Sequence, residues 1–208
     1  MRTIDLEHWP RRPHFELFRS YELPHLAVTA PVDVTALKAG AARRGLSLFH
    51  ALVWAATRAA NEVPELRQRI RGKTVVEHDR VHPSFTAAGP DETFLWCHAR
   101  WDPDPRGFAA AALAAERAAA ARDPLAEETG DDLLFVTSLP WLSFTALQHP
   151  MRVPGDCVPR IAWGRLERVA DRDRLPLALQ AHHALVDGLH VARFFRQFDE
   201  AVAALAAP

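Results

Sequence analysis

The sequence predicts an α+β protein in which a mixed β-sheet is covered by helices. Segments of helical and strand character follow one another in an irregular order, which argues against repeating βαβ units. One predicted helix, residues 48–60, is apolar around more than half of its circumference and is expected to be buried against a sheet. The 208 residues contain no internal repeat or low-complexity linker, so we expect a single domain, residues 1–208, with a substantial core.

Short runs rich in β-branched and aromatic residues, bounded by turn residues, predict the strands. They are expected at residues 26–30, 74–78, 84–88, 93–101, 133–138, 160–169 and 174–181. Residues 149–159 contain three prolines and Gly155, and they are expected to be irregular.

Apolar periodicity and capping residues predict the helices. They are expected over residues 32–44, 48–60, 105–122 and 191–198. The first has Asp33 or Thr35 as its cap and Gly45 as its stop, and Ser47 begins the second. His50 falls within the apolar pattern of the second helix, so we expect it to be a packed core or interface histidine.

Charge and composition limit the kind of partner and compartment. A formal net charge of −1 and a pI near 6.8 give no reason to expect nucleic acid or another polyanion. The acidic loop, residues 123–132, is expected to be simply solvated. Cys97 and Cys157 are interpreted as free thiols of a reducing compartment.

No segment has the pattern of a targeting or membrane-spanning sequence. Residues 1–7 carry charges where a signal peptide needs an apolar core. The alanine-rich residues 108–121 are too short to span a bilayer and are interrupted by Glu116 and Arg117. We therefore expect a soluble, cytoplasmic protein with no membrane partner.

The most informative stretch is QAHHALVDGLH, residues 180–190. It follows a predicted strand and precedes a predicted helix, so His182 and His183 lie where the strand ends. Asp187 and Gly188 lie at the turn into the helix, where Asp is a good cap and Gly permits a tight turn. The end of a strand is a place where a rigid scaffold can present a base to a substrate.

Three interpretations fit these residues. One histidine could abstract a proton, because imidazole titrates close to neutral pH. Alternatively His182, His183, Asp187 and His190 could bind a metal, although neighbouring strand residues point to opposite faces of a sheet. Finally, the residues could merely close a strand and cap a helix.

The string HHxxxDG at residues 182–188 resembles the signature of the chloramphenicol acetyltransferase superfamily, which includes dihydrolipoyl acyltransferase cores and peptide-synthetase condensation domains. With residues 189–193 it is most similar to the trimeric chloramphenicol acetyltransferases. The resemblance extends over nearly the whole chain. Further matching segments are residues 9–16, 61–67, 81–86, 92–94 and 138–144.

This resemblance implies a chloramphenicol acetyltransferase-like sandwich and an acyltransferase that uses acetyl-CoA as co-substrate and no metal. It implies direct acetylation of a hydroxyl of a small molecule, chloramphenicol or a related antibiotic, and hence antibiotic resistance. It also implies a homotrimer with active sites at subunit interfaces. Two alternatives are a CoA-dependent acyltransferase with a different alcohol or amine acceptor, and a non-catalytic drug-binding trimer.

By the same resemblance, His183 is the general base, and a backbone carbonyl rather than a carboxylate holds its other nitrogen. Asp187 is therefore not a triad acid. It is expected to pair with Arg11 through a bidentate bond that fixes the turn. Thr137 stands where the family has an oxyanion-stabilising serine, and Ser138 is the donor if the register differs.

The acceptor and CoA sites are also implied only by resemblance. The acceptor pocket is assigned to Phe18, Thr86, Phe94 and Leu147, and the CoA contacts are assigned to Trp141 and Arg165. Several positions depart from the chloramphenicol enzymes. Phe18 replaces a tyrosine, Leu147 a phenylalanine and Ala162 a threonine, while Leu95 and Trp96 are bulkier. The bulkier wall and the missing hydroxyl are compatible with catalysis but argue against chloramphenicol as the natural acceptor.

Overall fold

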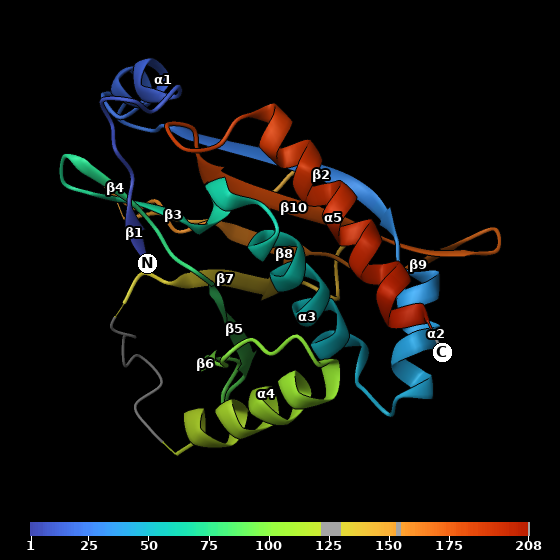
Figure 1. The fold of residues 1–208 in the computed structure, drawn as a ribbon. Coiled ribbons are helices and arrows are strands. Elements are labelled where there is room, and N and C mark those ends of the chain that lie inside the picture. Colours follow the sequence, from blue (N-terminus) through green and yellow to red (C-terminus); the bar gives the residue numbers. More distant parts are fainter. Residues whose placement is uncertain (122–129, 153–154, 208) are drawn as a thin grey trace.

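The computed structural model describes residues 1–121, 130–152 and 155–207. It confirms the predicted α+β class, with a mixed sheet covered by helices on one face (Figure 1). The large sheet has the order β2-β10-β8-β7-β5-β6, with β9 beside β10. Its strands are β2 (His25–Asp33), β5 (His82–Ala88), β6 (Phe94–His98), β7 (Leu133–Ser138), β8 (Arg160–Trp163), β9 (Glu167–Val169) and β10 (Arg172–His182).

A small antiparallel sheet, β1-β4-β3, lies beside the large one. It consists of β1 (Arg2–Thr3), β3 (Gln68–Arg71) and β4 (Thr74–Glu77). The helices are α1 (Arg12–Phe18), α2 (Thr35–Arg43), α3 (Leu48–Asn61), the 3₁₀-helix η1 (Pro64–Arg67), α4 (Pro105–Ala119) and α5 (Gly188–Ala206). None of the described helices has the length and apolar character needed to cross a membrane.

The large sheet is mixed because β7 runs parallel to both β5 and β8, whereas the other neighbours are antiparallel. β10 is buried along nearly all of its length, as its apolar sequence requires. It pairs with β2 from Arg174 opposite Asp33 to His182 opposite His25. This long pairing holds the end of β10, where His182 and His183 lie, in a fixed position.

The two faces of the large sheet differ. Figure 1 shows α2, α3, α4 and α5 on the same side of it, and the ring of Phe49 in α3 contacts those of Phe85 and Trp163. Because side chains alternate along a strand, Thr86 and Ala162 point to the opposite face. We call this the outer face of the sheet.

Most predicted elements are confirmed, with shifted boundaries. Ser47 caps α3 by accepting a hydrogen bond from the His50 backbone N–H, and His50 is buried beside Glu116. The Asp33 carboxylate accepts from the backbone N–H of Thr35 at 2.9 Å, at the start of α2. Sequence patterns did not predict α1, β1, β3 and η1, which are all short.

The predicted strand over residues 160–169 is instead two strands, β8 and β9, separated at Gly164. A Cβ atom on Gly164 would lie 2.5 Å from the carbonyl oxygen of Leu142 and 2.7 Å from Cγ of Pro176. The chain therefore leaves β8 through a close approach that only glycine permits.

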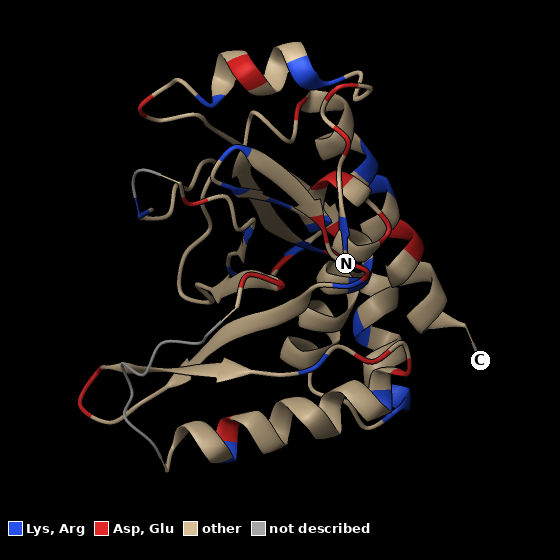
Figure 2. Ribbon diagram, turned by 60° about the vertical axis from the view of Figure 1, so that its left-hand side comes forward, with Lys and Arg blue, Asp and Glu red and all other residues tan. Residues whose placement is uncertain are grey.

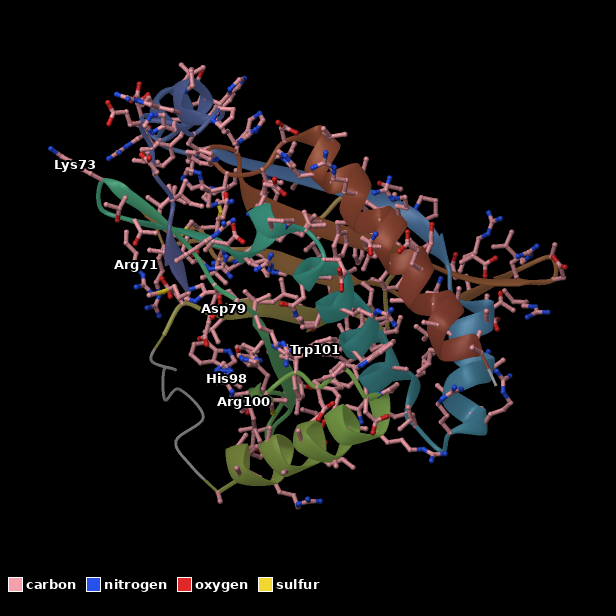
Figure 3. All side chains as sticks on the ribbon, in the orientation of Figure 1. Arg71, Lys73, Asp79, His98, Arg100 and Trp101 are labelled. Atoms are coloured by element: carbon pink, nitrogen blue, oxygen red, sulfur yellow. The ribbon has the colours of Figure 1, made fainter. Side chains whose placement is uncertain are left out.

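The expectation that the acidic loop is simply solvated is wrong at Asp131. Its carboxylate accepts two hydrogen bonds from Arg71, at 2.6 and 2.9 Å, and lies 2.9 Å from Nε2 of His78. The bond from Arg71 holds the pKa of Asp131 below its ordinary value. The ion pair between Arg71 and Asp131 anchors the β3–β4 hairpin, from which Lys73 projects (Figure 3). Glu127 and Glu128 lie outside the described residues.

Charged residues of both signs are interspersed along the helices and loops, while the strands of the large sheet are mostly uncharged (Figure 2). This distribution agrees with the small net charge of −1. The core lies between the sheet and its helices and includes Phe85, Ile161, Leu177, Phe194 and Phe198, each no more than 1% exposed.

Candidate active site

The turn between β10 and α5 is held by backbone hydrogen bonds. The N–H of His183 donates to the Pro24 carbonyl at 2.6 Å, and those of Leu185 and Val186 both donate to the His182 carbonyl at 3.0 Å. Asp187 then caps α5 by accepting from the Leu189 N–H at 3.0 Å. Because the turn's polar backbone groups have partners, its shape is well determined.

The two histidines of the pair have different environments. His182 is 5% exposed, and its Nδ1 accepts a hydrogen bond from the Ala184 N–H at 3.2 Å. Its ring lies edge-on to His25, with centroids 5.0 Å apart. Burial lowers the pKa of His182 to about 4, so this imidazole is neutral at pH 7. It is a buried structural residue.

His183 is only partly buried, and its two nitrogens are distinguished by one contact. Nδ1 lies 2.8 Å from the carbonyl oxygen of Val186. A carbonyl oxygen can only accept, so the proton of the neutral ring is on Nδ1 and Nε2 keeps a free lone pair. The ring of Phe18 stacks on His183, with centroids 4.0 Å apart and an interplanar angle of 25°.

Arg11 binds the turn through three hydrogen bonds. Its Nη1 donates to Asp187 Oδ2 at 2.6 Å, Nη2 to the His183 carbonyl at 2.8 Å, and Nε to the Ala184 carbonyl at 3.1 Å. The contact between Arg11 and Asp187 is therefore present, but the expected bidentate bond to the carboxylate is wrong. The guanidinium instead divides its donors between the carboxylate and the backbone of the turn.

The electrostatics of this contact favour an ionised aspartate. Burial tends to raise the pKa of Asp187, but the hydrogen bond from Arg11, with further contributions from His190 and Leu189, holds it below its ordinary value. The Arg11 side chain is only 12% exposed, so its bonds are shielded from water. The arrangement agrees with a positioning role for Asp187, because its carboxylate does not contact the His183 ring nitrogens.

Thr137 lies far from His183 in the same chain. Thr137 is paired with Ala162, and Ala162 with Ala178, whereas the histidines follow the far end of β10. With a rise of about 3.3 Å per residue and about 4.8 Å between strands, His182 lies roughly 13 Å along the strand and 10 Å across the sheet from Thr137. One chain does not bring the predicted base and oxyanion donor together.

The structure separates Thr137 from Ser138 by the face that each occupies. Ser138 is paired with Trp163, whose ring contacts Phe49 of α3, so Ser138 belongs to the helix-covered face. Thr137 belongs to the outer face. Phe85 is paired with Val136, so the next residues along these parallel strands, Thr86 and Thr137, are neighbours on that face.

The predicted site residues therefore form two groups. The histidine half-site consists of Arg11, Phe18, His183 and Asp187, beside the start of β2 and the end of β10. The hydroxyl half-site consists of Thr86, Phe94 and Thr137, on β5, β6 and β7. Phe94 is 49% exposed, and its ring centroid lies 6.2 Å from that of Trp96.

Three further predicted site residues lie in loops that connect the strands. Trp141 and Arg165 are assigned to CoA, and Leu147 is assigned to the acceptor pocket. Trp141, which is 75% exposed, is in the loop after β7. Arg165 follows β8, and its backbone N–H donates to the Leu142 carbonyl at 2.6 Å, which brings the two loops together. Leu147 is half-buried in the loop that reaches β10, where the His149 N–H bonds Gln180 at 2.7 Å.

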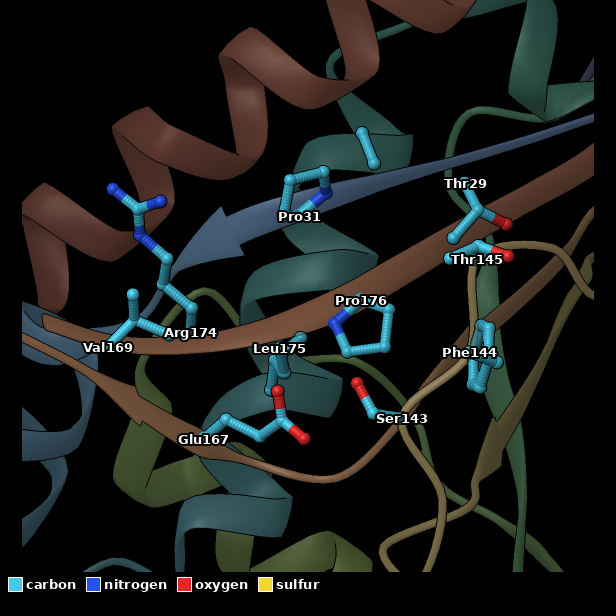
Figure 4. Close-up of a pocket in the computed structure, with 11 residues that line it drawn as sticks. Thr29, Pro31, Ser143, Phe144, Thr145, Glu167, Val169, Arg174, Leu175 and Pro176 are labelled. Atoms are coloured by element: carbon cyan, nitrogen blue, oxygen red, sulfur yellow. The ribbon is translucent and has the colours of Figure 1, made fainter.

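A pocket of about 370 Å³ lies between β2, β9, β10 and the loop after β7 (Figure 4). Among the residues that the structure describes, none of the predicted site residues lines it. Its walls are Thr29, Ala30, Pro31, Ser143, Phe144, Thr145, Glu167, Val169, Arg174, Leu175 and Pro176.

The metal interpretation gains no support from the placement of the donors. Nδ1 of His182 accepts from the Ala184 N–H, and Nδ1 of His183 donates to the Val186 carbonyl. In the described part of the chain, no group of three or more His, Cys, Asp and Glu side chains is arranged to hold a metal ion.

Sequence reasoning missed the polar cluster of His25, Asp156 and Arg160 that lies beside His182. The irregular stretch near residue 156 contributes Asp156, whose carboxylate forms an ion pair with Arg160 and whose carbonyl lies 2.8 Å from Nε2 of His25. The pairing of β2 with β10 then places His25 beside His182. The only signal in the sequence was the spacing of four between Asp156 and Arg160.

These buried histidines predict acid destabilisation. Burial lowers the pKa of both His149 and His182 to about 4, whereas an unfolded chain protonates histidine near 6.5. Below about pH 6.5 the unfolded state therefore binds more protons, and folding stability falls until about pH 4, where the folded state also titrates. We expect a loss on the order of 2 kcal/mol per histidine between pH 6.5 and 5.

Urea unfolding at pH 7 and pH 5 measures this loss. His182→Asn, which keeps an acceptor for the Ala184 N–H, should remove about half of this pH dependence, because His149 remains, whereas the exposed His14→Asn should leave it unchanged. Equal stability of the unmodified protein at the two pH values would show that these histidines titrate normally.

The fold and the family comparisons together define the protein as an acyltransferase. A solved chloramphenicol acetyltransferase superimposes with a TM-score of 0.89 and 26% identity, over 97% of this chain and 99% of its own. The truncated catalytic core of the 2-oxoacid dehydrogenase multienzyme complex from Thermoplasma acidophilum has the same fold, with a TM-score of 0.70 and 17% identity over 96% and 97% of the two chains.

Sequence comparison gives the particular family. The family model described as chloramphenicol acetyltransferase matches residues 1–199, and the chain belongs to this family. It is 36% identical over 206 residues to the chloramphenicol acetyltransferase of Streptomyces acrimycini, covering 96% of this chain and 93% of the relative. It is 32% identical over 195 residues to chloramphenicol acetyltransferase 2 of Escherichia coli, covering 92% of each.

Proposed function

We propose that the protein transfers the acetyl group of acetyl-CoA to a hydroxyl of chloramphenicol or a closely related small molecule, with His183 as the general base. The observation that carries this proposal is the contact between His183 Nδ1 and the Val186 carbonyl, 2.8 Å apart. It leaves Nε2 unprotonated on a ring that is partly exposed. Such a nitrogen can act as a general base without a metal.

The reaction proceeds by direct transfer. Nε2 of His183 takes the proton of the acceptor hydroxyl as its oxygen attacks the thioester carbonyl carbon. The tetrahedral intermediate then collapses, the carbon–sulfur bond breaks, and the CoA thiolate leaves with the proton returned by the imidazolium. The products are the acetyl ester and CoA, and no acyl-enzyme forms.

Thr137 supplies the hydroxyl that stabilises the oxyanion of the intermediate. Donors of this kind lower the barrier by about 3 kcal/mol. Its position beside Thr86 on the outer face supports this role over Ser138, which is paired with Trp163 on the helix-covered face. The hydroxyl half-site therefore provides the electrostatic part of catalysis.

The complete site forms between two copies of the chain in a homotrimer. The histidine half-site of one subunit meets the hydroxyl half-site of its neighbour. The separation of His183 from Thr137 within one chain supports this assembly. So do exposed apolar residues beside each half-site. They are Leu17, Tyr21 and Leu23 on one side, and Phe94, Trp141 and Leu142 on the other, each at least 49% exposed.

We assign acceptor binding to Phe18, Thr86, Phe94 and Leu147, and CoA binding to the loops that carry Trp141 and Arg165. The large exposed area of the Trp141 ring suits a contact with a ligand rather than with the core. We assign the reaction to the cytoplasm, where acetyl-CoA is available and where the thiols of Cys97 and Cys157, which form no disulfide, remain reduced.

A different alcohol or amine acceptor is the second candidate, and one residue beside each half-site favours it. Phe18 lies against the catalytic ring but has no hydroxyl with which to bind an acceptor or a water. Ala162, in the same row as Thr137, is fully buried and offers no side-chain donor. A pocket with fewer hydroxyls discriminates less strongly for polar acceptors.

The decisive experiment incubates the purified protein with acetyl-CoA and either chloramphenicol or a panel of hydroxylated and amine-bearing antibiotics, and measures release of the CoA thiol. Thiol release and a mass gain of one acetyl group with chloramphenicol are expected. Release only with another acceptor would favour the second candidate. Drug binding without any thiol release would leave a non-catalytic binding protein.

A further inference from the structure

Two polar side chains close to the turn, His190 and Glu65, have no role in the proposed acyl transfer. His190, in the first turn of α5, is 8% exposed, and Glu65, in η1, has a side chain that is 19% exposed. His190 Nε2 lies 3.5 Å from Glu65 Oε1. The other carboxylate oxygen of Glu65 is buried and has no hydrogen-bond partner among the described residues.

The second ring nitrogen of His190 contacts the backbone of the turn. Nδ1 accepts a hydrogen bond from the Asp187 N–H at 3.0 Å. The neutral ring therefore carries its proton on Nε2, the nitrogen that faces Glu65. Burial lowers the pKa of His190, which favours this neutral form at pH 7. The charged groups around it are Glu65 from η1, Asp187 from the turn, and Arg11 and Arg193.

The Asp187 N–H and the Val186 carbonyl belong to one peptide group. This peptide therefore lies between two imidazoles. Its oxygen accepts from His183 Nδ1 at 2.8 Å, and its nitrogen donates to His190 Nδ1 at 3.0 Å. Because a peptide bond is planar, fixing its N–H also fixes the direction of its carbonyl oxygen. Hydrogen bonding at the N–H also polarises the carbonyl and makes it a better acceptor.

We propose that His190 and Glu65 are positioning residues for acyl transfer: Glu65 orients the His190 ring, His190 holds the peptide between Val186 and Asp187, and that peptide fixes the tautomer and direction of the His183 ring. This inference rests on the proposed function of His183. It adds a second support for the turn, besides the hydrogen bonds from Arg11. Neither residue contacts the substrate.

The variants separate the two contacts of His190. His190→Ala removes both, and we expect kcat to fall about 10–100-fold while KM for acetyl-CoA and for the acceptor stays within about two-fold. His190→Asn can place an amide oxygen near the position of Nδ1, and we expect it to recover most of the lost kcat. Glu65→Gln, which keeps an acceptor but loses the charge, should lower kcat several-fold. Arg196→Ala on α5 and Glu62→Gln beside η1 are the matched controls.

A structural readout complements the kinetics. Imidazole ¹⁵N NMR of the folded protein should show His183 with its proton on Nδ1, and a mixture of tautomers in His190→Ala. Unfolding curves establish whether each variant is folded. If His190→Ala does not fold, His190→Asn and Glu65→Gln still test the proposal.

Wild-type kcat and an unchanged His183 tautomer in the folded variants would overturn the proposal. Absence of transfer in the unmodified protein, with a His183 tautomer that still depends on His190, would instead contradict the proposed function and leave the positioning role standing.

Discussion

Replacing His183 by alanine is expected to reduce acetyl transfer by roughly 10²–10⁴-fold, to the background of a thiol-release assay. The variant loses the ring whose Nε2 keeps a free lone pair, since Nδ1 donates its proton to the Val186 carbonyl. His182 cannot replace it, because that ring is 5% exposed and its Nδ1 accepts from the Ala184 N–H.

The fold should survive the change, because His183 contributes its backbone rather than its ring to the pairing at the end of β10. Its N–H bonds the Pro24 carbonyl, and its carbonyl accepts from Arg11. Circular dichroism and acetyl-CoA binding should therefore be close to those of the unmodified protein. The exposed His14→Ala is the control. Full activity of His183→Ala would mean that another group removes the proton.

The same variant tests where the two half-sites meet. Thr137→Ala should also be impaired, because it lacks the proposed oxyanion donor. Refolding a mixture of His183→Ala and Thr137→Ala chains should restore part of the activity, since some interfaces then pair an intact His183 with an intact Thr137 from another copy. No recovery in mixed oligomers would contradict a site shared between subunits.

The second large effect is expected for Arg11. Arg11→Ala should lower kcat by about 100-fold or more, because a displacement of about 1 Å at a catalytic group has that consequence. Each lost bond to the charged guanidinium also costs roughly 1.5–3 kcal/mol of turn stability. Arg11→Lys should be almost as impaired, since an ammonium group cannot reach the Asp187 carboxylate and two carbonyls with the same planar geometry.

Arg12→Ala is the matched control for this prediction. Arg12 is adjacent in sequence, but its side chain is 49% exposed and pairs with Glu16, one turn further along α1. Steady-state kinetics of Arg11→Ala, Arg11→Lys and Arg12→Ala show whether the planar geometry of the Arg11 guanidinium or only its positive charge is needed. Near wild-type turnover of Arg11→Ala would show that the turn holds its shape without the guanidinium. Normal activity of Arg11→Lys alone would show that charge suffices.

How far the sequence predicts this molecule depends on the range of each interaction. The strand before His182 and the cap at Ser47 are local patterns, and both are confirmed. The break at Gly164 was missed because it depends on Leu142 and Pro176, which are distant in sequence. The same is true of Asp131, whose partners Arg71 and His78 lie more than 50 residues away.

At the candidate site, the motif and the resemblance led to Arg11, His183 and Asp187, which the structure brings together. The division of the Arg11 donors between carboxylate and backbone could not be predicted, because residue spacing says nothing about the direction of carbonyl oxygens. The role of His190 was equally hidden. Its contact is with a backbone N–H, which every residue except proline possesses.

The distance between His183 and Thr137 has a consequence for how activity responds to dilution. If the proposed shared site is correct, the histidine half-site and the hydroxyl half-site of a single chain do not form a complete active site without another copy. Specific activity should therefore decline once the protein is diluted below the concentration at which copies associate, even while every molecule stays folded. In that case, a substitution that weakens the contact between copies would lower acetyl-transfer activity without changing any residue that takes part in the reaction.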